Sequence, residues 1–316
     1  MVRSPHLHNE PVITEARVDS GTAERGIRVG GHWISLTHVE RVLYKQDGIS
    51  KQHLIEYYYH AVGLILRYVR NRPLMMERAG WRNGSIEDVF VQQRPSPNFP
   101  PWINRVEVAM KGGVIEHVVC NDAATIIYLV NQGMITPHVW TSRIDAPNVP
   151  DQVVFDLDPG EGGFDVARTC AVSLKEVLEE RGLAAFVMTT GSHGLHVRTP
   201  IRREHEFSAV RGFARQLADH VAAANQRSMT TQVRKKKREG RLYIDTLRNS
   251  YGQNSVAPYA VRARRRAPVA TPLEWEELHN TAVTSDAFNL SNIRRRLTAK
   301  PDPWRKFYRH ARRLRL

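Results

Sequence analysis

The sequence predicts an α+β fold in which helices pack on one side of a β-sheet. A short run of β-branched and aromatic residues at Val153–Phe155 is typical of a buried strand. The segment 165–181 then carries apolar residues at helical spacing and stops at Gly182, which favours a helix. Another strand-like run follows at 184–188. A strand, a helix and a strand in this order favour a sheet that helices cover on one side.

Two carboxylates come at the end of the first predicted strand. Asp156 and Asp158 are alternate residues, so on a strand they project from the same face. Pro159 and Gly160 then end the strand. Two adjacent carboxylates repel each other unless a cation lies between them, and hard oxygen ligands favour Mg²⁺ or Mn²⁺. For this motif alone, an aspartate pair at the exposed end of a strand is the open alternative.

The composition indicates which partners the chain has. It has 316 residues, with 46 Lys and Arg against 32 Asp and Glu, a formal net charge of +14. This excess favours nucleic acid as the partner. A membrane is not expected, because no apolar run approaches the roughly 20 residues of a spanning helix and the N-terminus has no signal-peptide core. Cys120 and Cys170 are the only cysteines, so neither a disulfide framework nor a paired-cysteine zinc site is expected. We expect a soluble, cytoplasmic protein associated with the nucleoid.

Local patterns predict the remaining elements. Residues 1–30 are polar and aperiodic, which favours a flexible arm. Ser50 is the expected N-cap of a helix whose apolar residues recur at three- and four-residue intervals, and Asp122 is expected to cap a second helix over 123–131. The further predictions are hairpins around Gly30-Gly31 and Gly112-Gly113, a helical turn at 37–44, a helix at about 206–225, a strand at 241–245 and an Arg-rich helix at 301–316. The domains expected from these patterns are an arm at 1–30, one domain over 31–290 and a basic C-terminal helix within 291–316.

A glycine-containing turn follows the strand predicted at 184–188. Gly191 and Gly194 permit a positive φ or a close approach of another backbone. Amides, hydroxyls and imidazoles that converge on a turn can form a phosphate cradle, while a purely structural β-turn is the alternative. The polar side chains of this turn are those of Thr190, Ser192, His193 and His196.

A third aspartate and a basic run complete the pattern. Asp245 ends the strand predicted at 241–245 and supplies the third carboxylate that a two-metal centre needs. The run Arg234–Arg238 is either a solvated loop or, beside an acidic metal site, a contact for phosphates. Three strand-borne aspartates, a polar glycine turn and strong positive charge together favour nucleotidyl transfer. In that chemistry divalent cations activate a 3′-hydroxyl and neutralise a triphosphate.

The sequence resembles the polymerase domain of bacterial DNA ligase D, in the archaeo-eukaryotic primase superfamily. The resemblance extends from about Leu36 to Leu278. It implies an RRM-like catalytic sheet that packs with a second sheet and flanking helices. The matching motifs are Val42-Leu43-Tyr44, Asp156-Leu157-Asp158-Pro159-Gly160, Gly194-Leu195-His196, Tyr243–Asn249, Val256–Arg264 and Trp275–Leu278.

The resemblance also implies roles for individual residues. They are metal binding and catalysis for Asp156, Asp158 and Asp245; nucleotide binding for Thr190, Ser192, His193, His196 and Arg262; template stacking for Phe90; grip of a 5′-phosphate for Lys51 and Arg41; and a place near the active site for His138. The implied activity is template-directed addition of nucleotides, with a preference for ribonucleotides, to 3′-ends at gaps or double-strand breaks during non-homologous end joining. The implied cofactor is Mn²⁺ or Mg²⁺, and the implied partners are DNA ends or gapped DNA with a 5′-phosphate, nucleoside triphosphates, Ku and a DNA ligase.

Two positions depart from the family pattern. His193 stands where the family usually has a lysine, so a triphosphate contact there depends on protonation near neutral pH. Gln253 replaces a lysine of some members. Both changes affect nucleotide affinity more than metal binding. The ligase and phosphoesterase domains that often accompany this polymerase have no counterpart in the chain, so we expect a stand-alone form.

Two other functions fit parts of the pattern. A phosphatase of the haloacid dehalogenase type also has Asp-x-Asp after a strand, but it places Thr or Val shortly after the second aspartate, where this chain has Pro159-Gly160-Glu161. A non-catalytic protein that binds or bridges DNA ends would use the basic charge and Phe90 equally well. It would not need all three aspartates, and this favours an enzyme.

Overall fold

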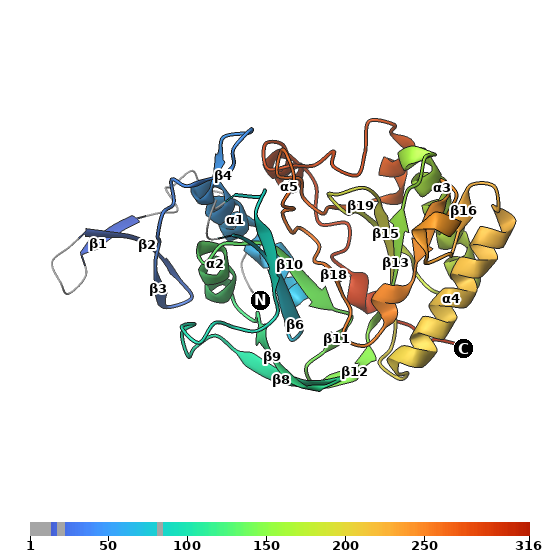
Figure 1. Cartoon of the computed structure of the whole chain (residues 1–316), viewed down its shortest axis with the longest axis horizontal. Helices are drawn as coiled ribbons and strands as arrows, with labels where there is room; N and C mark the ends of the chain where they lie inside the picture. The colour runs from blue at the N-terminus through green and yellow to red at the C-terminus, as the bar shows by residue number, and fades with distance from the viewer. Residues whose placement is uncertain (1–13, 18–22, 81–84) are drawn as a thin grey trace. The chain divides into compact units, whose positions relative to one another are not determined.

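The computed structural model describes residues 14–17, 23–80 and 85–316 (Figure 1). The chain forms two compact units, where the sequence predicts one domain over 31–290. Unit 1 extends to His138 and includes Ala263–Ala267, and unit 2 comprises Val139–Arg262 and Pro268–Leu316. Helices and several sheets occur together, which confirms the α+β class. No helix among the described residues is long and apolar enough to cross a membrane.

The described residues of unit 1 form two α-helices and a mainly antiparallel sheet. The helices are α1 (Lys51–Val69) and α2 (Ala123–Asn131), and the strands of the sheet are β6 (Pro73–Ala79), β7 (Val89–Gln92), β8 (Arg105–Met110), β9 (Gly113–Val119) and β10 (Met134–Trp140). The strands follow the order β10-β6-β9-β8, and β7 pairs with β6. Both predicted helix starts are confirmed. Asp122 accepts a hydrogen bond from the Thr125 N–H group at 2.7 Å, as an N-cap does, and the predicted apolar face of α1 is buried.

The structure describes strands in part of the predicted N-terminal arm. β1 (Thr14–Arg17), β2 (Ala23–Val29) and β3 (His32–Ser35) form a three-stranded antiparallel sheet, and only the hairpin at Gly30-Gly31 is as predicted. Residues 1–13 and 18–22 of the arm lie outside the described residues. Backbone pairing forms β1 and the first half of β2 from charged and small residues that carry little strand propensity. The helical turn predicted at 37–44 is wrong, because β4 (Val42–Tyr44) pairs with β5 (Ile49–Ser50).

Unit 2 is built around a six-stranded sheet with the order β16-β17-β13-β15-β14-β19. All neighbours are antiparallel except β16 and β17. The strands of unit 2 are β11 (Ser142–Arg143), β12 (Ala146–Pro150), β13 (Gln152–Asp158), β14 (Phe186–Thr189), β15 (Leu195–Pro200), β16 (Met229–Thr230), β17 (Leu242–Asp245), β18 (Asn254–Val256) and β19 (Pro272–Leu273). Its α-helices are α3 (Gly163–Glu180), α4 (Phe207–Ala224) and α5 (Ile293–Ala299).

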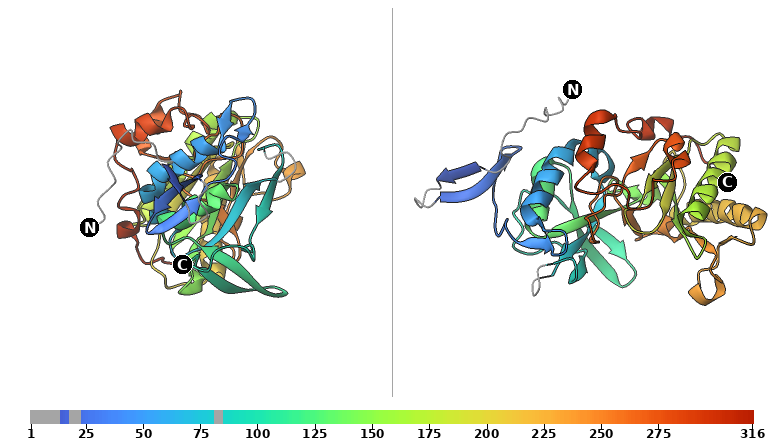
Figure 2. Two further views of the ribbon diagram at one scale, coloured as in Figure 1. Left: turned by 90° about the vertical axis from the view of Figure 1, so that its left-hand side faces the viewer. Right: turned by 90° about the horizontal axis from the view of Figure 1, so that it is seen from above.

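Helices α3 and α4 cover one side of this sheet, as the sequence predicts (Figures 1 and 2). Val153, Phe155 and Leu157 of β13 point into a core that they share with buried side chains of both helices, such as Leu174 and Leu217. Burial of each such side chain contributes roughly 1.5–3 kcal/mol. Because neighbouring residues of a strand face opposite sides, the same packing directs Asp156 and the other even-numbered residues to the face without these helices.

The helix predicted at 301–316 is wrong. A 3₁₀ turn at Phe307–His310 is the helical structure found in this stretch, and a basic helix within 291–316 is limited to α5. Trp304 and Phe307 are almost fully buried, and the Phe307 ring lies 4.9 Å from that of Phe186 on β14. The aromatic spacing therefore serves packing against the sheet. Further on, Arg312 pairs as an isolated parallel bridge with Ile201, so the end of the chain is extended.

Candidate active site

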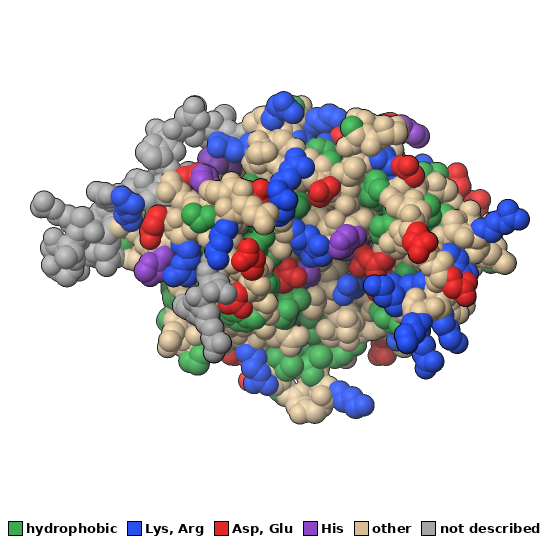
Figure 3. All heavy atoms as spheres, turned by 45° about the horizontal axis from the view of Figure 1, so that its top comes forward, with side chains coloured by type: hydrophobic (Ala, Val, Ile, Leu, Met, Phe, Trp, Pro, Cys, Tyr) green, Lys and Arg blue, Asp and Glu red, His purple; other side chains and the backbone are tan. Residues whose placement is uncertain are grey.

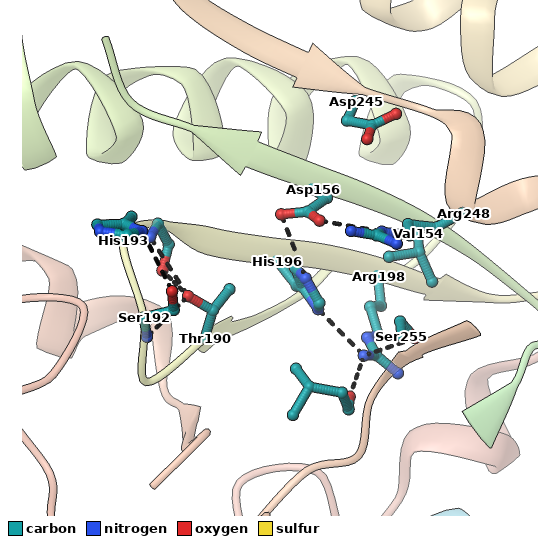
Figure 4. Close-up of polar contacts among 12 residues, drawn as sticks. Val154, Asp156, Thr190, Ser192, His193, His196, Arg198, Asp245, Arg248 and Ser255 are labelled. Carbon is teal, nitrogen blue, oxygen red and sulfur yellow. Dashed lines mark hydrogen bonds and ion pairs between the residues drawn. The ribbon is translucent and has the colours of Figure 1, made fainter. Parts of the chain in front are cut away.

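The register of three neighbouring strands places polar residues on the open face of the unit-2 sheet. Asp156 of β13 lies directly opposite Asp245 of β17 on one side and directly opposite His196 of β15 on the other. Asp158 lies opposite Tyr243. Residues directly opposite each other share a face of the sheet. The three predicted aspartates and His196 therefore belong to one surface. Figure 4 shows Asp156, Asp245 and His196 on it.

The Asp156 carboxylate is buried between two cationic or hydrogen-bonding side chains. Its Oδ1 lies 3.3 Å from His196 Nε2, and its Oδ2 lies 3.2 Å from Arg248 Nε. Burial alone would raise the pKa of Asp156, but His196 and Arg248 outweigh it and hold that pKa well below its usual range. Burial lowers the pKa of His196, so its imidazole is neutral near pH 7. Arg248, which the sequence analysis did not assign, is thus the main positive charge next to Asp156.

The other two carboxylates behave differently. Partial burial, together with the negative charges of Asp156 and Asp245, raises the pKa of Asp158 to about 6. Burial also raises the pKa of Asp245, whose Oδ1 accepts hydrogen bonds from the Leu247 N–H group at 2.7 Å and the Tyr243 hydroxyl at 3.3 Å. The three aspartates therefore lie close enough to oppose each other's ionisation. A divalent cation would relieve this repulsion, so the donor set fits one chemically.

The aspartates carry the charge of a metal site, but the described side chains do not have the arrangement of one. Among residues 14–17, 23–80 and 85–316, no three His, Cys, Asp or Glu side chains converge as a metal site. One carboxylate oxygen of Asp156 contacts His196 and the other contacts Arg248. A cation shared by the aspartates would have to replace part of these contacts.

A buried arginine lies behind His196. Arg198, two residues further along β15, is 2% exposed. Its Nη2 donates to His196 Nδ1 at 3.1 Å, to Ser255 Oγ at 3.1 Å and to the Val256 carbonyl at 2.8 Å (Figure 4). Because Arg198 can only donate, His196 Nδ1 accepts. The proton of the neutral imidazole is therefore on Nε2, the atom that faces Asp156.

The glycine turn between β14 and β15 is tied together by Thr190. Its Oγ1 accepts from the N–H groups of Ser192 at 3.2 Å and Gly194 at 3.3 Å, and donates to the Gly194 carbonyl at 3.0 Å. Thr190 is buried, Ser192 is half-buried and His193 is exposed at the tip. The Thr190 hydroxyl thus serves the structure of the turn, as the alternative of a purely structural β-turn predicts. Ser192 and His193 are accessible to a ligand. Arg262 Nη1 donates to the Thr190 carbonyl at 3.0 Å, which brings another predicted nucleotide-binding residue to this turn.

Glycine is required where the turn meets the aspartate strand. A Cβ on Gly194 would lie 1.8 Å from the carbonyl oxygen of Leu157, the residue between Asp156 and Asp158. Such a contact is far inside van der Waals distance, and the obstacle is backbone that cannot rotate away. Gly191 has φ +64°, which also favours glycine. The turn and the carboxylates are therefore held in one fixed arrangement.

Comparison with known proteins identifies the family. The model of the LigD primase-polymerase domain matches residues 50–304. The chain belongs to this family. It is 29% identical over 263 residues to the multifunctional non-homologous end joining DNA repair protein LigD of Mycobacterium tuberculosis, a match that covers 79% of this chain and 34% of the relative. It is 30% identical over 298 residues to LigD of Pseudomonas aeruginosa, covering 93% and 35%. The chain thus spans about a third of the length of these relatives.

A solved structure has the same fold. The polymerase domain of Mycobacterium tuberculosis ligase D, in complex with DNA, superposes with a TM-score of 0.82 at 26% identity, covering 88% of this chain and 99% of that domain. The resemblance to the LigD polymerase domain and the primase-type fold are confirmed. A polymerase domain of this family is a nucleotidyltransferase, and the family is metal-dependent.

The residues predicted from the LigD resemblance to bind DNA belong to unit 1. Lys51 is buried at the start of α1, where its Nζ donates to the Asn131 carbonyl at 2.7 Å. The Lys51 N–H group donates to the Arg41 carbonyl at 2.9 Å, so the two basic residues predicted to grip a 5′-phosphate are neighbours in space. Burial and the charge of Arg41 lower the pKa of Lys51 to about 8. Phe90 is half-buried on β7, with the Arg78 guanidinium 5.5 Å from its ring centre.

His138 makes a contact of its own. Its Nε2 lies 3.5 Å from Glu77 Oε1 within unit 1. The structure therefore brings the predicted residues together in two groups. The aspartates and the nucleotide-binding residues form one group in unit 2, and Lys51 and Arg41 form another in unit 1.

Proposed function

We propose that the chain is a metal-dependent, template-directed nucleotidyltransferase that extends 3′-ends at DNA gaps or double-strand breaks during non-homologous end joining, using ribonucleotides in preference. The observation that carries this proposal is the strand register, which puts Asp156 directly between Asp245 and His196 with Asp158 on the same face. Three carboxylates in this arrangement match the requirement of nucleotidyl transfer for divalent cations.

Asp156, Asp158 and Asp245 would hold Mn²⁺ or Mg²⁺, which when bound supplies charge neutralisation for a triphosphate and its leaving group. The side chains of the chain supply the rest. His196, with its Nε2 proton fixed by Arg198, is a hydrogen-bond donor at the edge of the carboxylates. Ser192 and His193 offer donors to phosphate oxygens at the turn. Arg262 adds a positive charge beside them, because its guanidinium is anchored to the Thr190 carbonyl.

The proposed substrate is a DNA end or gap with a 5′-phosphate, paired with a nucleoside triphosphate. Lys and Arg side chains are spread over the face of the molecule shown in Figure 3, in keeping with the net charge of +14. The related ligase D domain was solved in complex with DNA. Lys51 and Arg41 would contact the 5′-phosphate and Phe90 would stack on the template strand. Ku and a DNA ligase are the proposed partners, in the cytoplasm where the DNA is.

A non-catalytic role in binding or bridging DNA ends is the second candidate. One observation favours it, since Asp156 already forms an ion pair with Arg248 and a contact with His196. Such a protein would bind DNA ends normally and add no nucleotides.

The test is extension of a primer on gapped DNA with a downstream 5′-phosphate, in Mn²⁺, with either ribo- or deoxynucleotides. We expect wild type to add the templated nucleotide and Asp158→Ala to be slower by on the order of 10²–10³ or more, with DNA binding retained. Asp165→Ala, which removes an exposed carboxylate on α3, is the matched control and should retain full activity. Equal activity in wild type and Asp158→Ala would refute the metal assignment. Intact DNA binding without any addition would establish the bridging role.

A further inference from the structure

A groove of about 630 Å³ lies in unit 2 at the far end of β15 from His196. Arg202 lies six positions beyond His196, which corresponds to about 20 Å of extended chain, so the groove is separate from the carboxylate site. Arginines from three chain segments line it. They are Arg181, Arg202, Arg312, Arg313 and Arg315.

Hydrogen bonds and packing hold the backbone of these arginines in place. Arg181 follows the last turn of α3, where its N–H group donates to the Leu178 carbonyl at 3.1 Å. The Arg202 N–H group donates to the Arg312 carbonyl at 2.8 Å, next to the bridge between Ile201 and Arg312. Leu314, which is 2% exposed, anchors the end of the chain in the core. The backbone under the guanidinium groups is therefore ordered by contacts that do not use the guanidinium groups themselves.

The positive charges of the groove are not balanced by acidic neighbours. Arg313 pairs with Glu204 at 3.2 Å. The other four arginines are exposed and form no ion pair with any carboxylate in the described part of the chain. Glu180 is the one acidic residue among those that line the groove. Like charges around a concave surface repel each other and concentrate a positive potential, which a bound polyanion would neutralise.

The floor of the groove decides which polyanion fits. Leu183 and Phe213 form its apolar part, but they are only 3% and 4% exposed. An acidic peptide needs apolar anchors to bind well, and this floor has little apolar surface to offer one. Phosphate groups need only guanidinium groups, which bind them in a bidentate manner.

We propose that the groove binds the phosphate backbone of double-stranded DNA, without sequence preference and away from the 3′-end that reacts. This inference rests on the proposed action on DNA. It adds a contact to the duplex that flanks the gap or break. Its main determinants are Arg202 and Arg312, because they lie side by side across the bridge and have no carboxylate partner.

The experiment compares the full-length double variant Arg202→Gln/Arg312→Gln with the control Arg294→Gln/Arg295→Gln. The control removes the same charge from exposed positions of α5 in the same unit. Binding of a blunt duplex without a 5′-phosphate is measured by fluorescence anisotropy over a series of salt concentrations. We expect the groove variant to bind about tenfold more weakly at low salt. Its slope of log K against log salt should fall by about 2, since each phosphate contact contributes about 0.9. The control should keep the slope of wild type.

Equal losses in the two double variants would overturn the proposal, because net charge alone would then explain binding. Loss of polyglutamate binding in the groove variant with unchanged DNA binding would overturn it in favour of an acidic protein partner. Nucleotide addition separates this inference from the proposed function. On saturating gapped DNA, the groove variant should react at the wild-type rate with a raised KM for DNA. If wild type adds no nucleotides and the groove variant still loses duplex affinity and salt slope, the groove stands and the polymerase proposal fails.

Discussion

Asn249 completes the hydrogen bonding of the strand that carries Asp156. β17 pairs with β13 only from Asp156 to Asp158, so Val154 has no strand partner on that side. The Asn249 side chain takes the place of one. Its Oδ1 accepts from the Val154 N–H group at 2.8 Å, and its Nδ2 donates to the carbonyls of Val154 at 2.7 Å and Thr246 at 2.9 Å. Asn249 and Val154 are both fully buried.

Removal of the Asn249 side chain should destabilise unit 2. Asn249→Ala leaves the N–H and C=O groups of Val154 buried without a partner on this side. Each unsatisfied buried group costs about 1–3 kcal/mol, so we expect the two groups to cost about 2–6 kcal/mol in the free energy of unfolding. For a unit of this size, that loss corresponds to a fall in Tm of about 4–24 °C.

Urea and thermal unfolding of the purified variants measure this loss. Asn249→Leu keeps about the size of the side chain but removes its hydrogen-bonding groups, so a similar loss in that variant would assign the effect to hydrogen bonds and not to a cavity. Asn148→Ala changes an exposed asparagine of the same unit and should stay within about 0.5 kcal/mol of wild type. A loss below about 1 kcal/mol in Asn249→Ala would refute the reasoning.

Two further predictions concern pH. Lys51 has a pKa of about 8, lowered by burial and Arg41, so between that pH and its ordinary value of 10.5 the unfolded chain binds more protons. The free energy of unfolding of wild type should therefore rise by about 2 kcal/mol from about pH 7.5 to about pH 9.5, relative to that of Lys51→Met. Urea titrations of both proteins at the two pH values measure this rise, and equal changes in the two proteins would contradict it. Burial would raise the pKa of Glu277, but Arg296 and Lys300 lower it to about 2. Glu277→Gln should cost about 1 kcal/mol at neutral pH, where solvent screens the pair, and the difference from wild type should vanish as the pH falls from 4.5 to 2.

Local signals in the sequence were sufficient for the elements that depend on neighbouring residues. Ser50 and Asp122 mark helix starts through capping groups within a turn of them. The alternation of Asp156 and Asp158 with apolar residues fixed which face of the strand they share. The C-terminal segment failed because its aromatic spacing resembles a helix. The partner that decides its conformation, Phe186, lies far away in the sequence.

The residues of the candidate site also divide into those that local signals predict and those that depend on distant strands. The third carboxylate and the glycine turn could be selected by residue type, but their register with Asp156 depends on pairing between distant strands. Arg198 had a signal, because it alternates with His196 on a strand and so had to share its face. Arg248 lies three residues beyond Asp245 and could have been weighed as the charge that balances the aspartates. No local pattern distinguishes Asn249 from an ordinary loop residue, because its partner Val154 is 95 positions away.

The pairing of Asp156 with Asp245 also has a consequence for synthesis of the protein. The two residues are 89 positions apart in the chain. At about 5–20 residues per second, a ribosome adds Asp245 about 4–18 s after Asp156. Through that interval the nascent chain has the first two carboxylates but not the strand that aligns with them. A partly made chain therefore lacks the complete group of carboxylates until β17 has emerged and paired with β13.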